Sequence, residues 1–149
     1  MATIQRIQHV SVPMPPGREA EARQFYGSAL GLEEVAPPEE LSRLRLIWFR
    51  VGEADAELHC FTEEGLQPNT PAQHLCFQVD DLDAVRERLI QHGVTIEPTI
   101  EIHHRPRFFI RDPFGNSIEI VQILGRYRMA EIDGGHGESA STSRSDPNP

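Results

Sequence analysis

Residues 74–83 read HLCFQVDDLD, and this stretch decides the fold. Its first part alternates apolar and more polar side chains, which predicts a strand over residues 73–79. The aspartates that follow offer an N-cap for a helix that runs to about His92, where Gly93 ends it. The stretch therefore predicts a strand that leads directly into a helix.

The remaining chain extends this pattern in both directions. After the helix we expect an extended segment at 96–102, a strand at 107–111, a turn at 112–116 and a last strand at 118–123. Before it we expect a strand at 4–13, a helix at 18–30, a loop at 33–40, and strands at 44–51 and 56–61. The order is strand, helix and further strands, written twice.

Matched residues support an internal repeat. A Gln-His pair recurs 65 positions on, and a helix-ending glycine and a strand glutamate each recur 62 positions on. The matched positions are 8–9 with 73–74, Gly31 with Gly93, and Glu57 with Glu119.

Composition excludes several classes of function. The chain has 149 residues, a formal net charge of -9, and fourteen basic residues that are all arginine. Without lysine, Schiff-base aldolases, pyridoxal-phosphate enzymes and P-loop proteins are excluded. The acidic surplus disfavours nucleic acid and membrane surfaces as partners, because both attract basic faces.

The length indicates one domain, predicted over residues 1–125, with modules at 1–68 and 70–125. Residues 126–149 form a tail, and from about 134 its polar composition predicts disorder. Cys60 and Cys76 are expected to be buried thiols. No secretory signal or membrane span is recognised, so a cytoplasmic protein is expected.

Strand alternation places four candidate ligands on the sides of their strands that face away from the helices. They are His9, Glu57, His74 and Glu119. A pseudo-two-fold relation between the halves would bring them together. His59 shares a face with Glu57, so either could be the fourth ligand and the other a base. One of Trp48 and Phe49 should face the same cleft.

Two imidazoles and two carboxylates suit one divalent first-row metal: Zn²⁺, Ni²⁺, Co²⁺, Mn²⁺ or Fe²⁺. Because no thiolate joins the set, a closed structural zinc site is not expected.

These motifs resemble the vicinal oxygen chelate superfamily, which includes glyoxalase I, extradiol dioxygenases and bleomycin resistance proteins. The resemblance runs from residue 4 to about 124 and rests on four stretches. They are residues 9–13 (HVSVP), 25–32 (FYGSALGL), 74–83 (HLCFQVDDLD) and 112–119 (DPFGNSIE).

The resemblance implies an α+β fold of two tandem βαβββ modules that curve into a half-barrel cleft around a metal. It assigns His9, His74 and Glu119 as metal ligands, with Glu57 as the additional ligand of glyoxalase I-like members. Many members of this length are homodimers with sites across the subunit interface. The lack of lysine speaks against a fosfomycin-type transferase, and the two-module length against a typical extradiol dioxygenase.

The leading hypothesis is a metal-dependent enzyme whose small substrate chelates the metal through neighbouring oxygens, with isomerase, lyase or dioxygenase chemistry. Its candidate catalytic residues are Glu57, His59 and Glu119. The alternative is a bleomycin-resistance-like protein that sequesters a small molecule without catalysis.

Overall fold

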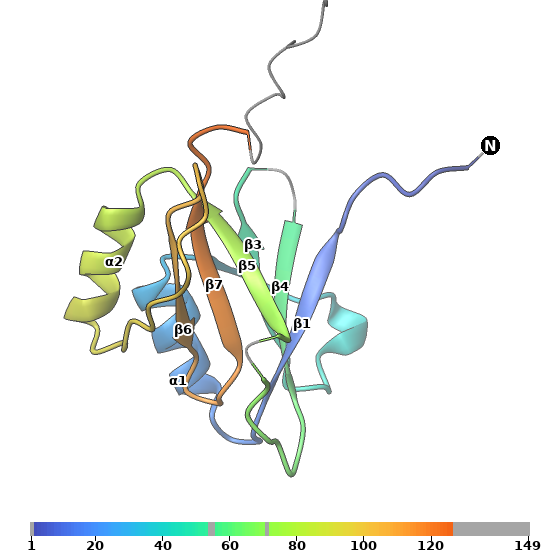
Figure 1. The fold of residues 1–149 in the computed structure, drawn as a ribbon. Helices are drawn as coiled ribbons and strands as arrows, with labels where there is room; N and C mark the ends of the chain where they lie inside the picture. Colours follow the sequence, from blue (N-terminus) through green and yellow to red (C-terminus); the bar gives the residue numbers. More distant parts are fainter. Residues whose placement is uncertain (1, 54–55, 71, 127–149) are drawn as a thin grey trace, which may run out of the picture.

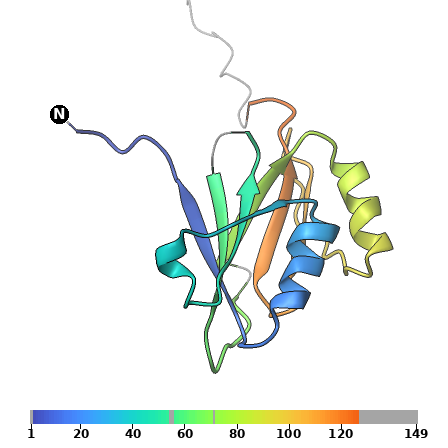
Figure 2. The same ribbon diagram turned by 180° about the vertical axis from the view of Figure 1, so that it is seen from behind.

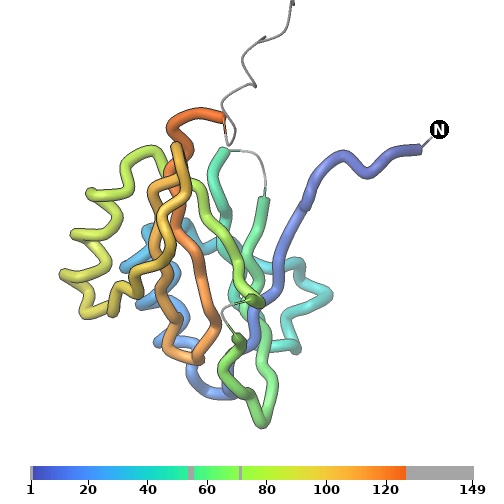
Figure 3. The backbone as a smooth tube through the Cα atoms, viewed as in Figure 1, coloured from blue at the N-terminus to red at the C-terminus, as the bar shows by residue number. Residues whose placement is uncertain are grey.

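The structure is a computed structural model that describes residues 2–53, 56–70 and 72–126. Its first sheet, sheet A, joins four strands in the order β1 (His9–Met14), β4 (Ala56–Thr62), β3 (Ile47–Val51) and β2 (Glu33–Val35). β1 runs parallel to β4, and the other neighbours are antiparallel. The path of the chain through this sheet can be followed in Figure 3.

The second sheet, sheet B, repeats this arrangement with one strand fewer. Its order is β5 (His74–Val79), β7 (Ser117–Gln122) and β6 (Arg107–Arg111), with β5 parallel to β7 and β6 antiparallel to it. The position of a fourth strand is taken by a single bridge between Glu97 and Phe109. Pro98 follows directly and has no backbone N–H to continue the ladder.

Helices connect the strands within each half. In the first half, α1 (Glu19–Ala22) continues into the π-helical segment η1 (Arg23–Ala29), and a short 3₁₀ turn, η2 (Glu39–Leu41), follows later. In the second half, α2 (Leu82–Gln91) starts at the N-cap Asp81, whose side chain accepts a hydrogen bond from the Ala84 N–H at 2.9 Å. The expected cap and helix are thus confirmed.

The core lies between the helices and one face of each sheet. α1 and α2 lie on the same side of the molecule, with β1 on the opposite side (Figures 1 and 2). Tyr26 and Phe49, from η1 and β3, are fully buried, as are Leu89, Ile118 and Ile120 from the second half. All belong to one apolar cluster. Burial of these alternate residues leaves the other face of each sheet for polar side chains.

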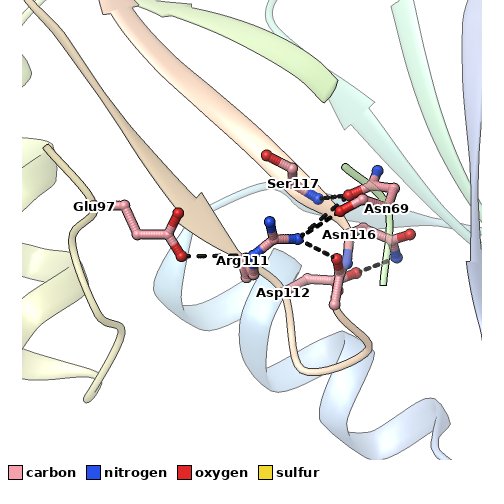
Figure 4. Close-up of polar contacts among 7 residues, drawn as sticks. Asn69, Glu97, Arg111, Asp112, Asn116 and Ser117 are labelled. Atoms are coloured by element: carbon pink, nitrogen blue, oxygen red, sulfur yellow. Dashed lines mark hydrogen bonds and ion pairs between the residues drawn. The ribbon is translucent and has the colours of Figure 1, made fainter. Parts of the chain in front are cut away.

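Polar contacts at the turn between β6 and β7 tie the two halves together. Asp112 accepts hydrogen bonds from the Tyr26 hydroxyl at 2.7 Å and from the Asn116 side chain at 2.6 Å. Asn116 Nδ2 also donates to the Pro13 carbonyl of β1 at 2.9 Å. Beside this cluster, Arg111 donates to Asn69 O, and Asn69 Oδ1 accepts from the Ser117 N–H (Figure 4).

The fold class is confirmed as α+β with paired modules of the βαβββ kind, but several expected limits change. Residues 2–8 are not a strand: β1 begins at His9, and Ile4 and Ile7 are exposed. Glu33–Val35, expected in a loop, pairs with β3. The predicted tail lies, apart from Arg126, outside the described residues.

Candidate metal and substrate site

The open face of sheet A, which points away from the helices, carries the first half of the candidate site. Register places His9 of β1 beside Glu57 of β4, with Ser11, His59 and Trp48 abreast in the next row. This is the face that strand alternation predicts, and Trp48 rather than Phe49 is the aromatic residue on it.

Glu57 and His59 form a close pair on this face. His59 Nε2 lies 2.9 Å from Glu57 Oε2, and Gln8 Nε2 donates to the same oxygen at 3.2 Å. The hydrogen bond with His59, followed by that from Gln8, lowers the pKa of Glu57 below its usual value. Glu57 is therefore an ionised carboxylate at neutral pH.

His59 is held between two other rings. Its ring stacks on Trp48 with centroids 3.8 Å apart and on His9 with centroids 4.4 Å apart. The His59 side chain is 11% exposed and that of Glu57 is 28% exposed. Of the two candidates for the fourth ligand, Glu57 is thus the more accessible, and His59 is placed to orient it.

The open face of sheet B carries the second half. Glu119 of β7 has His74 Nε2 at 2.9 Å from one oxygen and receives a hydrogen bond from Arg107 Nη1, also at 2.9 Å, on the other. Its side chain is only 10% exposed. Burial of a carboxylate is unfavourable without hydrogen-bonding partners, and His74 and Arg107 provide them here.

Arg107 is the site residue that sequence reasoning missed. β6 alternates, with Phe108 and Ile110 in the core, so Arg107 and Phe109 must share the open face with Glu119. The signal was therefore present in the strand, but only the pairing of β6 with β7 brings this arginine to Glu119.

Each half borders a hollow. One of about 350 Å³ lies beside Glu57 and Trp48, and another of about 480 Å³ lies beside Glu119 and Arg107. A larger hollow of about 610 Å³ lies on the helix side, between Phe25 and His92. None of the predicted ligands lines this larger hollow. The candidate site is therefore identified by the side chains on the open faces and not by the volume of the hollow.

The structure thus brings the predicted residues together as two groups. His9, Glu57 and His59 lie on sheet A, and His74 and Glu119 lie on sheet B. Within residues 2–53, 56–70 and 72–126, no three His, Cys, Asp or Glu side chains gather closely enough to hold a metal ion. The convergence of all four ligands at one point remains a prediction.

The donor set itself fits a divalent metal. Each group pairs an imidazole nitrogen with a glutamate oxygen at 2.9 Å, and imidazole with carboxylate is the combination that first-row divalent ions accept. Among the described residues neither group includes a thiol: Cys60 lies on the core face, and Cys76, although paired with Glu119 on the open face of sheet B, forms no three-ligand cluster with His74 and Glu119. Cys76 is exposed, which corrects the expectation that both thiols are buried.

Comparison with known proteins establishes the family. The sequence model of the Glyoxalase/Bleomycin resistance protein/Dioxygenase superfamily matches residues 6–120. The chain therefore belongs to this superfamily, as the four stretches of sequence indicated. No helix among the described residues is long and apolar enough to cross a membrane.

Three relatives illustrate the range of this superfamily. An ethylmalonyl-CoA/methylmalonyl-CoA epimerase of Cereibacter sphaeroides is 32% identical over 80% of this chain and 99% of its own. A crystal structure described as a glyoxalase family protein from Bacillus anthracis is 36% identical, with a TM-score of 0.76, and covers 83% of this chain and 98% of its own. The crystal structure of TnmS3, an antibiotic binding protein from Streptomyces, is 25% identical, with a TM-score of 0.67. The match covers 83% of this chain and 99% of TnmS3.

Proposed function

We propose that the chain is a metal-dependent enzyme that moves a proton at a carbon next to a carbonyl group of a small substrate. The observation that carries this proposal is the placement of an imidazole–glutamate pair on the open face of each sheet. The epimerase relative, which is similar over most of both chains, supports the choice of reaction.

His9, His74 and Glu119 would hold the metal, and of the Glu57–His59 pair we assign Glu57 as the proton acceptor beside it. When bound, a divalent ion in such a site supplies positive charge where negative charge develops on the substrate oxygens. The choice of Glu57 over His59 rests on its greater exposure.

The chain's own residues would handle the proton. Glu57 is ionised at neutral pH because His59 and Gln8 donate hydrogen bonds to it, so it is available as a proton acceptor. His59 would fix the orientation of Glu57, since Trp48 and His9 hold its ring on both sides. The Trp48 side chain, which borders the hollow beside Glu57, would exclude water from this side of the substrate.

Because the two ligand groups are separate within one chain, a complete metal site requires the missing ligands from a second protein surface. A second copy could supply it, with the open face of sheet A from one copy meeting that of sheet B from the other. We therefore propose a homodimer with two shared sites, in agreement with what the family resemblance implies.

Metal uptake tests the site directly. Chelator-treated protein should bind about one Ni²⁺, Zn²⁺, Co²⁺ or Mn²⁺ per chain after dialysis, measured by elemental analysis. His74→Ala should abolish this uptake, whereas His92→Ala, which removes a histidine at the end of α2 on the helix side, should not. Full uptake by His74→Ala would exclude the proposed ligand set.

Deuterium exchange tests the reaction. Metal-loaded protein in D₂O should exchange the C2 proton of methylmalonyl-CoA or a related 2-substituted thioester, followed by NMR. Glu57→Gln should slow the exchange by about 10²-fold or more. If the metal-loaded protein exchanges the C2 proton of no such thioester, the proposed reaction is wrong.

Mixing variants tests the shared site. His9→Ala and His74→Ala are each expected to lose metal, but a mixed dimer should regain one intact site of its two. Elemental analysis of the refolded mixture should then recover metal, and no recovery would place all ligands within one chain.

A second candidate function is binding without catalysis. It is favoured by the row of stacked rings His9, His59 and Trp48 on the open face of sheet A, which an aromatic ligand can extend, and by the similarity to an antibiotic binding protein. Tight binding of an aromatic compound that is unaffected by metal removal would support this function over the enzyme.

A further inference from the structure

The hollow beside Glu119 has an unusual charge for this protein. Its volume is about 480 Å³, and its wall includes Gln78, Arg105, Arg107, Glu119, Val121 and Ile123. Although the whole chain carries a net charge of -9, this wall includes two arginines and one glutamate, and the Arg105 guanidinium donates to the His104 and Gly125 carbonyls. It is therefore a locally basic hollow with apolar sides.

Arg107 has donor capacity beyond its bond to Glu119. Its Nη1 donates to Glu119 at 2.9 Å, and its Nη2 makes a longer bond of 3.3 Å to the Ile100 carbonyl. Its Nε is buried and has no hydrogen-bond partner among the described residues. Each of Nη1 and Nη2 carries a second N–H beyond the bonds to Glu119 and Ile100, so the guanidinium keeps two donors for an acceptor.

Arg107 also separates two hollows. On its other side lies a hollow of about 420 Å³, whose wall includes Arg86, His103 and His104. The guanidinium of Arg86 forms an ion pair with Asp83 and lies over the Phe108 ring, 5.1 Å from its centroid. The walls of the two hollows thus combine Arg86, Arg105 and Arg107 with the acidic Glu101 and Glu119, and this small basic surplus favours an anionic ligand.

We propose that Arg107 is a specificity-determining residue that binds a carboxylate group of the substrate in this hollow. A guanidinium presents two parallel N–H groups that match the two oxygens of a carboxylate. Val121 and Ile123 make the adjacent wall apolar, which suits a short aliphatic chain. The inference rests on the proposed function, because it places this carboxylate beside the Glu119 half of the metal site.

Fragment binding tests this assignment without a known substrate. The probe is isobutyrate, and isobutyramide is its uncharged match in shape. Titration of the full chain, followed by NMR, should show binding of isobutyrate about tenfold or more tighter than isobutyramide, since hydrogen bonds between charged groups contribute this much. Shifted signals should include Gln78 and Arg107.

Variants assign the preference to one side chain. Arg107→Gln should remove the preference for isobutyrate, and Arg107→Lys should restore part of it, because lysine keeps the charge but loses the planar pair of donors. Arg23→Gln, which removes an arginine from an exposed pair with Glu34, should leave the preference unchanged. If Arg107→Gln does not fold, the Arg107→Lys variant tests the assignment, because a reduced preference for isobutyrate supports it and an unchanged preference contradicts it.

Equal binding of the two fragments, no binding of either, or a preference that survives in both Arg107 variants would overturn the proposal. Metal uptake, measured on the same samples, separates it from the proposed function. If the chain binds isobutyrate through Arg107 but takes up no metal, the carboxylate site is supported and the proposed metal-dependent enzyme is contradicted.

Discussion

Single buried polar residues hold the two halves in register. Asp112 accepts four hydrogen bonds, from the Tyr26 hydroxyl, the Phe114 and Asn116 backbone, and the Asn116 side chain. Tyr26 is fully buried, and this burial, with the charge of Asp112 adding to it, raises its pKa well above the usual value.

Tyr26→Phe is expected to lower the free energy of unfolding by about 1.5–3 kcal/mol, because one hydrogen bond to a carboxylate is lost. A raised pKa in the folded state means that stability is complete below the usual tyrosine pKa of about 10 and falls as the pH rises above it. Cys60, whose pKa burial raises to about 12, acts in the same direction. Urea unfolding from pH 7 to 11 should show a shallower alkaline fall in the variant; an unchanged pH profile would exclude Tyr26 as a source.

The two cysteines should differ in reactivity. Cys60 is buried, whereas Cys76 is exposed on β5, although partial burial raises the pKa of its thiol to about 11. A thiol reagent should therefore modify one cysteine in the native protein. Below the pKa of Cys76, the rate should rise about tenfold for each unit of pH, because the thiolate is the reactive form. Cys76→Ser should abolish this reaction, and a native protein that titrates two thiols would contradict the structure.

At the scale of elements, the β6–β7 turn depends on one glycine. Gly115 has a φ of +92°, and an added Cβ would lie 3.0 Å from Pro68 Cβ and 3.1 Å from its Cα. Both the backbone conformation and the space therefore require glycine. Gly52 has a φ of +64°, but no atom of the residues that the structure describes lies within 4 Å of its added Cβ.

Gly115→Ala should destabilise the protein more than Gly52→Ala does. For Gly52→Ala we expect about 1–2 kcal/mol from the left-handed backbone alone. For Gly115→Ala the contact with Pro68 should add about 1–3 kcal/mol. Chemical unfolding of the two variants measures the difference, and equal losses would show that the linker at Pro68 moves aside freely.

At the scale of the whole molecule, the two halves share one core. Arg88 of α2 donates to the Ala29 and Leu30 carbonyls at the end of η1, both at 3.0 Å. Asn116 reaches the Pro13 carbonyl from the other half. These contacts and the common apolar cluster join the two halves, and we propose that residues 1–125 fold as one domain.

The halves should therefore unfold in one cooperative transition. Fluorescence of Trp48, which reports on sheet A, and amide exchange of β7, which reports on sheet B, should give the same free energy of unfolding. Asn116→Ala should lower both values equally. Separate transitions would show that modules 1–68 and 70–125 are independent units.

The sequence by itself determined the order of elements, the faces of the strands and the candidate ligands. Local patterns sufficed, because side chains alternate along a strand and Asp81 and Gly93 mark the ends of a helix. The same alternation placed His9, Glu57, His74 and Glu119 away from the helices. The family resemblance rests on these same local stretches.

Only the tertiary structure decided which of these residues meet. The contact of Arg107 with Glu119, 12 residues on, depends on the pairing of β6 with β7, and that of Tyr26 with Asp112, 86 residues on, depends on the packing of η1 against the β6–β7 turn. The pairing of Glu33–Val35 with β3 depended in the same way on a neighbouring strand rather than on its own acidic sequence. The arrangement of the ligands as two groups follows from the same cause, because each group belongs to one sheet.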